Sequence, residues 1–201
     1  MMSLVTTYLK GVQKHFSTRE KEQFCFVHGA TPDDIEELKT TYPLCPDSVI
    51  EFLSIVDGTN GRIYNKDYVD ITVLADLEQY PHSLLSVQEI LKERDYDETT
   101  FKRYMDDTVT TEDSLKDFVD IDPKVDVNIS LKHALCFSVG INGSACLYID
   151  FNPTQEGKIG QIISYEHDPD LHIVIADNFD EYLQLLINQD FSFMTEKDDD
   201  E

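Results

Sequence analysis

The sequence predicts a domain of mixed helical and strand structure, with an antiparallel sheet built from strands that follow one another closely. Two observations support this prediction. The first half contains helix start signals followed by apolar residues at helical spacing, whereas residues 131–166 contain three strand-like runs joined by turns. Strands joined by such short connections form an antiparallel meander. The length of 201 residues fits one domain with additions.

The N-terminal part of the chain predicts a helical extension followed by a well-marked helix. Residues 1–30 carry a slight basic excess, and their apolar residues follow a loose helical spacing. Thr31 is a good N-cap for the next helix, and Pro32 suits its first position. Pro43 ends that helix, because proline cannot continue it.

Three further elements are predicted before the middle of the chain. A helix begins at Pro46, because the apolar residues after it recur at i, i+3, i+4 and i+7 and share one buried face. Gly58 ends this helix, and the Asn-Gly pair at 60–61 makes a tight turn. Residues 68–74 alternate like a strand, and residues 83–94 predict another helix.

Residues 95–128 differ from the rest, because they are acidic, weakly patterned and free of glycine. Short helices are expected around 101–105 and 115–119, with a turn at 122–123. We interpret this segment as an acidic insert that faces a partner. The alternative is an ordinary peripheral helical excursion, which is common for solvated charged segments.

The second half contains the strongest strand pattern. The runs 131–139, 144–151 and 159–166 predict three strands of the meander, and residues 167–176 add a short extended run. Asn178 can cap a last helix, and the glutamate three residues later completes a capping-box pattern.

The loop between the second and third strands has a recognisable turn chemistry. Asp150 precedes an Asn-Pro turn, so its carboxylate is expected to accept backbone N–H bonds there. Gly157 is expected to adopt a positive φ where the loop returns. Gly160 indicates a bulge or a close backbone approach in the returning strand. We therefore interpret this stretch as a hairpin and not as the edge of an active site.

The charge balance predicts what the protein binds. The chain has 40 acidic and 16 basic residues, for a net charge of -24. Such a chain repels nucleic-acid phosphates and anionic membranes, so we expect neither as a partner. Its field favours basic partners and speeds their encounter at low salt. The alternative is that the acidity serves only solubility.

The apolar runs and the cysteine spacing predict the compartment and the use of cofactors. We expect a cytoplasmic protein, because the first residues do not form a signal peptide and no apolar run approaches the roughly 20 residues of a membrane span. The cysteines form no CxxC pair, so we expect reduced thiols, no metal site and no cofactor. They are Cys25, Cys45, Cys136 and Cys146.

The order of these patterns resembles the SUKH superfamily, which includes fungal regulators of cell-wall glucan synthesis and many bacterial immunity proteins. The resemblance covers roughly residues 31–190. It implies an α+β fold with a twisted, mainly antiparallel sheet flanked by helices, a protein-binding role and no catalytic residue. A single SUKH-like domain would then span residues 31–193, with a disordered acidic tail at 194–201. The resemblance is carried by Pro46, Phe52, Leu53, Gly61, Asp150, Pro153, Gly157, Gly160, Gln161, Ile162, Ala176, Phe179 and Leu183.

Enzyme chemistry has one weak candidate. The stretch from His167 to His172 also contains Asp168 and Asp170, which are residue types that bind metals. However, a proline makes it a turn, and the helical spacing of metalloprotease motifs is missing. No nucleophile elbow, P-loop or dinucleotide-binding motif appears, so we expect no enzyme.

The preferred hypothesis is an immunity-type binder that neutralises a basic, nucleic-acid-acting toxin. Its carboxylates would mimic the phosphate backbone that such a toxin grips. The alternative is a regulatory scaffold linked to cell-wall synthesis, and an unrecognised enzyme or a small-ligand sensor also stays open. The expected partner contacts are Tyr96, Tyr104, Asp106, Asp107, Glu112, Asp113, Asp117, Asp120, Glu166, Asp168 and Asp170.

Overall fold

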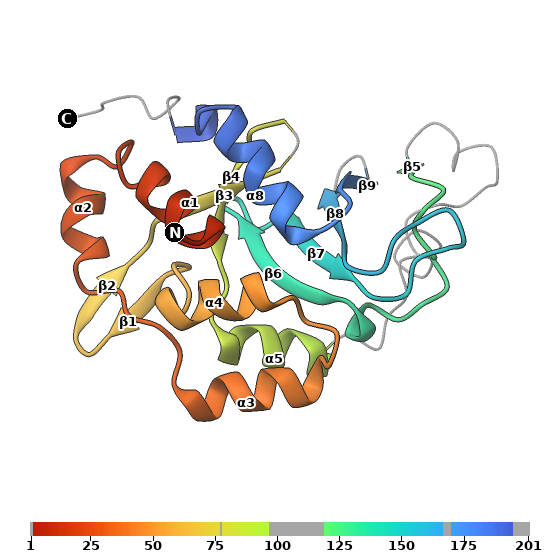
Figure 1. The fold of residues 1–201 in the computed structure, drawn as a ribbon, viewed down its shortest axis with the longest axis horizontal. Helices are drawn as coiled ribbons and strands as arrows, with labels where there is room; N and C mark the ends of the chain where they lie inside the picture. Colours follow the sequence, from red (N-terminus) through yellow and green to blue (C-terminus); the bar gives the residue numbers. More distant parts are fainter. Residues whose placement is uncertain (1, 77, 97–118, 167–169, 195–201) are drawn as a thin grey trace.

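The computed structural model describes residues 2–76, 78–96, 119–166 and 170–194 (Figure 1). The α-helices are α1 (Leu4–Val12), α2 (Thr18–Phe24), α3 (Pro32–Thr41), α4 (Asp47–Ile55), α5 (Val87–Tyr96) and α8 (Phe179–Asn188). The strands are β1 (Arg62–Tyr64), β2 (Asp67–Val69), β3 (Thr72–Ala75), β4 (Pro81–Leu84), β5 (Val119–Ile121), β6 (Leu135–Gly140), β7 (Ala145–Asp150), β8 (Gln161–Glu166) and β9 (Asp170–Ala176). Two short 3-10 helices are η1 (Leu131–His133) and η2 (Ser192–Met194).

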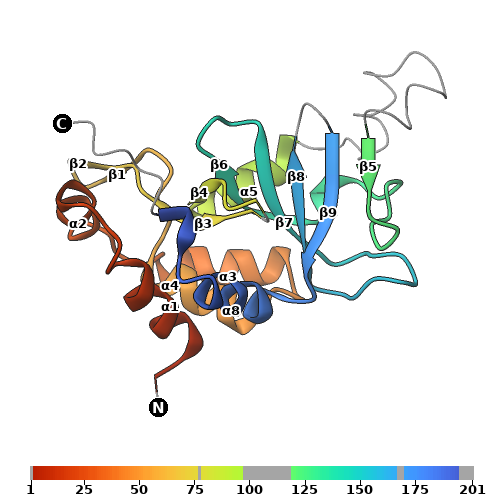
Figure 2. The same ribbon diagram turned by 90° about the horizontal axis from the view of Figure 1, so that it is seen from above.

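The strands form a seven-stranded sheet in the order β3-β4-β6-β7-β8-β9-β5, and β1 and β2 form a separate hairpin. Neighbouring strands from β3 to β9 pair antiparallel, which confirms the predicted meander, whereas β5 pairs with β9 in parallel. Figure 2 shows α1, α3, α4 and α8 together on one side of the sheet, with α5 beside β6. The fold is therefore α+β, as predicted.

One core joins the helices to the sheet. The aromatic rings of Phe179 and Phe137 pack edge to face with centroids 5.5 Å apart, which ties α8 to β6. The Tyr182 hydroxyl donates to the Ala75 carbonyl at 2.7 Å. The Tyr8 hydroxyl of α1 donates to a β3 carbonyl at 2.7 Å and the ring is fully buried. Residues before 31 thus contribute to the same core as the rest of the chain.

The helix start signals are present as the sequence predicts. The Thr31 side chain accepts the Asp34 N–H, and Pro32 occupies the first turn of α3. The Asn178 side chain accepts the Glu181 N–H at the start of α8. These bonds satisfy N–H groups that a helix leaves without an intrahelical partner.

Four local predictions were wrong. Residues 83–94 are not one helix, because 83–84 belong to β4 and α5 begins only after Ser86. The Ser86 and Glu89 side chains cap each other's backbone N–H groups, which fixes that start. The run 68–74 is divided between β2 and β3, and 131–133 is a 3-10 turn.

The fourth correction concerns the end of the acidic insert. Residues 115–119 were expected to be helical, but Val119 begins β5 and pairs with Asp170 across the parallel ladder. The register places the three residues of β5 at the outer edge of the seven-stranded sheet. The sheet is therefore mixed at this edge, because the chain enters it from a long connection and not from a hairpin.

Candidate functional site

The loop between β7 and β8 is built around Asp150, as the turn chemistry predicted. One carboxylate oxygen of Asp150 accepts the Asn152 N–H at 2.8 Å, and the other accepts the Gln161 amide at 2.9 Å. The Asp150 carbonyl accepts the Gly160 N–H at 2.7 Å. Burial raises the pKa of this carboxyl, while its two hydrogen bonds lower it. Its side-chain hydrogen bonds are to Asn152 and Gln161, at the two ends of the loop, which indicates a structural role.

The two glycines of this loop have roles opposite to those predicted. Gly160 lies at φ +90°, in the left-handed region, and a Cβ there would meet nothing within 4 Å. Gly157 has no such φ, but its Cβ would lie 2.6 Å from the Pro153 Cβ and 2.7 Å from the Lys124 carbonyl oxygen. Gly160 therefore makes the turn, and Gly157 allows a close backbone approach.

The close approach at Gly157 fixes the chain that follows β5. The Thr154 N–H donates to the Lys124 carbonyl at 3.0 Å, and its hydroxyl donates to the Pro123 carbonyl at 2.8 Å. The Gln161 amide donates to the same Lys124 carbonyl at 3.1 Å. The loop thus positions the end of the acidic insert against the sheet.

The sheet brings two distant groups of predicted contact residues together. Leu171 of β9 is paired with Glu166 on one side and with Asp120 on the other. Asp170 is the first residue of β9, next to Leu171, although the position of its side chain is outside the described part. Carboxylates from β8 and β5, 46 positions apart by their numbers (166 − 120), therefore lie in one row.

Sequence analysis missed two further members of this acidic group. Asp76 and Glu78 lie in the turn between β3 and β4, and their charges reach Glu166. Burial raises the pKa of Glu166, and the carboxylates of Asp76 and Glu78 raise it further. Only their effect on Glu166 of β8 identifies them, because their spacing in the sequence does not indicate a shared site. We call Asp76, Glu78, Asp120 and Glu166 the acidic end.

Asp76 differs from the other members because it is buried and bonded. Its carboxylate accepts the Tyr80 N–H at 2.8 Å and lies 3.8 Å from the His82 ring, whose other nitrogen is 2.9 Å from the Ser138 hydroxyl. These three side chains are the types of a hydrolase triad, but Ser138 and His82 are fully buried between strands. We interpret them as a core polar network.

The remaining predicted contacts lie at the border of the described residues or beyond it. Tyr96 is the last residue of α5, and its side chain is not described. The predicted contacts that fall outside the described residues are Tyr104, Asp106, Asp107, Glu112, Asp113, Asp117 and Asp168.

The metal candidate gains no support from the described part. His172 is fully buried with its ring 4.9 Å from that of Tyr165, and His167 and Asp168 lie outside the described residues. Within residues 2–76, 78–96, 119–166 and 170–194, no three His, Cys, Asp or Glu side chains gather as metal ligands would.

The other motif residues support the fold. Phe52, Leu53, Phe179 and Leu183 are buried in the common core, and the Phe52 and Phe179 rings lie 6.1 Å apart. Pro46 is the N-cap of α4, and Gly61 adopts a positive φ of 57° before β1. None of the helices in the described residues has the length and apolar character that a bilayer crossing requires.

The fold and the site define an α+β domain with a mixed, mostly antiparallel sheet, as the resemblance implied. The model of the SMI1 / KNR4 family (SUKH-1) matches residues 29–185. The chain therefore belongs to the SMI1 / KNR4 family (SUKH-1). A search of curated proteins returned no match.

Proposed function

We propose that this chain is a non-catalytic, cytoplasmic protein-binding module that acts as an immunity protein against a basic, nucleic-acid-acting toxin. The observation that carries the proposal is the acidic end, where Glu166 lies close enough to Asp76 and Glu78 for like charges to raise its pKa. Like charges that lie near one another favour the binding of a cation, because a basic partner reduces their repulsion.

Two further facts support a protein partner. Asp120 of the acidic end lies on β5, the last strand of the described sheet, where backbone groups of a partner can approach. The net charge of -24 gives the whole molecule a field that steers a basic protein toward it. A toxin that grips nucleic-acid phosphates has a basic cleft, which such a field attracts.

A regulatory scaffold linked to cell-wall synthesis is the second candidate, and membership of the SMI1 / KNR4 family favours it. The two candidates differ in the partners they predict. An immunity protein binds one basic toxin, whereas a scaffold binds several envelope-synthesis or signalling proteins that need not be basic.

The test is affinity purification of the tagged full chain from its native cells at low salt, followed by mass spectrometry. The test variant combines Glu78→Gln, Asp120→Asn and Glu166→Gln. We expect the wild type to retain one basic protein at stoichiometric yield and the variant to lose it. Several envelope proteins in its place would favour the scaffold, and retention of the basic protein by the variant would refute the role of the acidic end.

A matched control removes the same number of charges elsewhere. Glu22, Glu37 and Glu156 are exposed and lie on α2, α3 and the β7–β8 loop. Their triple change to Gln is expected to leave capture intact. If this control loses the partner as completely as the test variant does, net charge and not the acidic end determines binding.

A further inference from the structure

A cleft on another part of the molecule has the opposite charge character. It lies where the C-terminal end of α3, the last turn of α5, η1 and the residue after β7 meet. Its outer part has a volume of about 140 Å³ and its inner part about 20 Å³, and both are lined by Tyr42 and Arg94. The outer part is lined by Thr41, Tyr42, Pro43, Leu44, Arg94, Lys132, His133 and Phe151.

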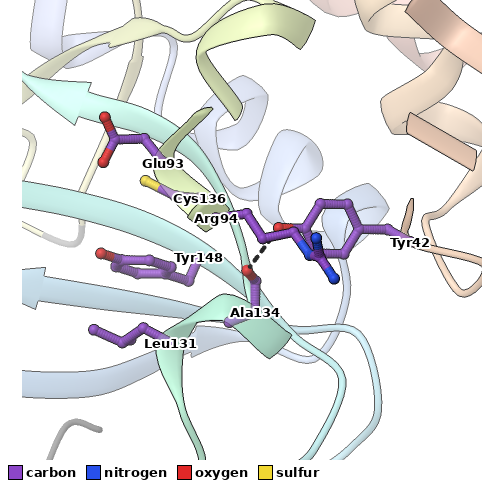
Figure 3. A pocket seen from close by; sticks show the side chains of 7 residues that line it. All are labelled: Tyr42, Glu93, Arg94, Leu131, Ala134, Cys136 and Tyr148. Atoms are coloured by element: carbon purple, nitrogen blue, oxygen red, sulfur yellow. Dashed lines mark hydrogen bonds between the residues drawn. The ribbon is translucent and has the colours of Figure 1, made fainter. Parts of the chain in front are cut away.

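The inner part is a narrow continuation of this cleft. Figure 3 shows Tyr42 and Arg94 on one side, with Tyr148 and Leu131 on the other and Cys136 and Glu93 farther along. The Tyr42 hydroxyl donates to the Ala134 carbonyl at 3.4 Å, which holds the ring in place (Figure 3). A volume of about 20 Å³ accommodates about one water molecule, so a ligand group would occupy the outer part.

The lining of the outer part departs from the composition of the chain. Acidic residues outnumber basic ones by 40 to 16 in the sequence, yet the described residues that line this part include Arg94, Lys132 and His133 and no acidic residue. The acidic group that faces the cleft is Glu93, which lines the inner part. We call the outer part, defined by its eight lining residues, the cation-lined cleft.

Apolar residues line the same cleft as these cationic groups. The Tyr42 and Phe151 rings lie 6.0 Å apart, and both side chains are buried. Leu44 is 59% exposed at the rim, although most leucine side chains in the core of this protein are below 5%. The cleft thus offers an apolar contact and a positive charge to the same ligand.

The size of the cation-lined cleft limits its occupant. Sites for small-molecule ligands enclose roughly 300–1,000 Å³. A volume of about 140 Å³ is suited instead to one amino-acid residue. A chain end with an apolar side chain presents both an apolar group and a carboxylate within one residue, whereas an internal residue presents only one of them.

We infer that the cation-lined cleft binds the carboxyl-terminal residue of a partner protein, one whose last side chain is apolar or aromatic. Its carboxylate pairs with Lys132, Arg94 and His133, and its side chain packs on Leu44 and Phe151. This site differs from the acidic end in position and in the charge it selects. A partner would use both only if it carries a basic surface and an apolar chain end.

The test is a titration of the isotope-labelled full chain, followed by backbone amide NMR shifts. N-acetyl-phenylalanine supplies the ring and the terminal carboxylate, and its carboxamide supplies the ring alone. N-acetyl-glutamate methylamide presents a carboxylate as an internal side chain does. We expect saturable shifts at 41–44, 132–133 and 151 with the first probe, and affinities at least about tenfold lower for the other two.

Two variants test the role of charge. Lys132→Glu is expected to weaken the binding of N-acetyl-phenylalanine at least about tenfold, because it places a like charge beside the carboxylate of the probe. Lys66→Glu makes the same change in the exposed β1–β2 turn and is expected to leave the affinity unchanged. Retained dispersion of the amide spectrum shows that each variant is folded.

Three outcomes would overturn the inference. Equal binding of the carboxamide would show an apolar pocket without charge selection. Tighter binding of the glutamate derivative would show a site for internal acidic segments. Absence of saturable shifts at these residues would show that the cleft binds no chain end. The variant that combines Glu78→Gln, Asp120→Asn and Glu166→Gln is expected to bind N-acetyl-phenylalanine as the wild type does. Loss of probe binding at the cleft can therefore be distinguished from loss of partner binding at the acidic end.

Discussion

The acidic end and the cation-lined cleft present opposite charges, although both lie beside the same two hydrophobic clusters: Ala75, Tyr42 and Phe151 belong to the larger one, and Ile121 and Leu131 to the smaller one. The acidic end gathers carboxylates from β3–β4, β5 and β8 through strand pairing and close approach in space. The cleft gathers cationic groups from the ends of α5 and η1, beside the end of α3. A net charge of -24 therefore describes the average surface and not each of its sites.

The two regions also differ in what stabilises their charges. Arg94 lies in the last turn of α5, and Lys132 and His133 lie in η1. Cations are favoured at the C-terminal ends of helices, where the backbone carbonyls carry partial negative charge. Glu166 of the acidic end instead lies near the carboxylates of Asp76 and Glu78, which disfavour its charge. The end of α5 thus favours the charge of Arg94, whereas the neighbours of Glu166 disfavour its charge.

The largest effect is expected from a change in the larger hydrophobic cluster, which lies beside both regions. Phe179→Ala removes a ring that contacts Phe52, Phe137 and Tyr182, so it should cost about 3–5 kcal/mol of stability. If the core is common, NMR reporters in the cleft and at the acidic end should lose structure at the same urea concentration. Separate transitions would show two folding units, and would contradict a core common to the two regions.

The sequence predicted most of the fold because its signals are local. Thr31, Pro32 and Asn178 mark helix starts by their own side-chain chemistry, and the meander follows from short connections. The errors arose where a tertiary contact decides the outcome. The helix α5 begins after Ser86 and not at residue 83, and the β5 strand depends on its pairing with β9.

The candidate site was less predictable than the fold. Glu166 and Asp120 were expected as separate groups, and only the pairing of both with Leu171 places them together. Asp76 and Lys132 gave no signal, because a single charged residue in a turn is common in any soluble chain. The Gly157 and Gly160 roles were exchanged, since φ at a glycine depends on the backbone around it.

An intermediate effect should come from the loop that positions the acidic end. Gly157→Ala places a Cβ 2.6 Å from the Pro153 Cβ and 2.7 Å from the Lys124 carbonyl oxygen. The loop must move, so we expect a loss of about 1–3 kcal/mol in urea unfolding. Amide shifts should concentrate in residues 119–127 and be small at 41–44, which would sharpen the contrast between the regions.

Gly160→Ala is the matched control for this change. A Cβ at Gly160 meets nothing within 4 Å, so the cost is the strain of φ +90° for an alanine. That strain is about 1–2 kcal/mol and involves no clash with Lys124. Gly160→Ala should therefore leave the shifts at 119–127 small. If it displaces these residues as strongly as Gly157→Ala does, the contact with Lys124 is not what holds the acidic end.

The smallest effect is expected from Glu166→Gln, and its pH dependence distinguishes it. Burial and the charges of Asp76 and Glu78 raise the folded-state pKa of Glu166 above its usual 4.5. The folded state therefore binds the Glu166 proton more tightly than the unfolded state does. Ionisation of Glu166 lowers the free energy of unfolding as pH rises from the unfolded-state pKa through the folded-state pKa. Below both pKa values the group is protonated in each state and contributes no difference.

We expect the stability of Glu166→Gln to match that of the wild type near pH 4 and to exceed it at pH 7 by less than about 1 kcal/mol, since solvent screens a half-buried group. Thermal unfolding at several pH values measures this gap. A gap that is constant from pH 4 to 7, or that favours the wild type at pH 7, would mean that the carboxylates of the acidic end do not repel one another. The acidic end would then be compensated like the cleft.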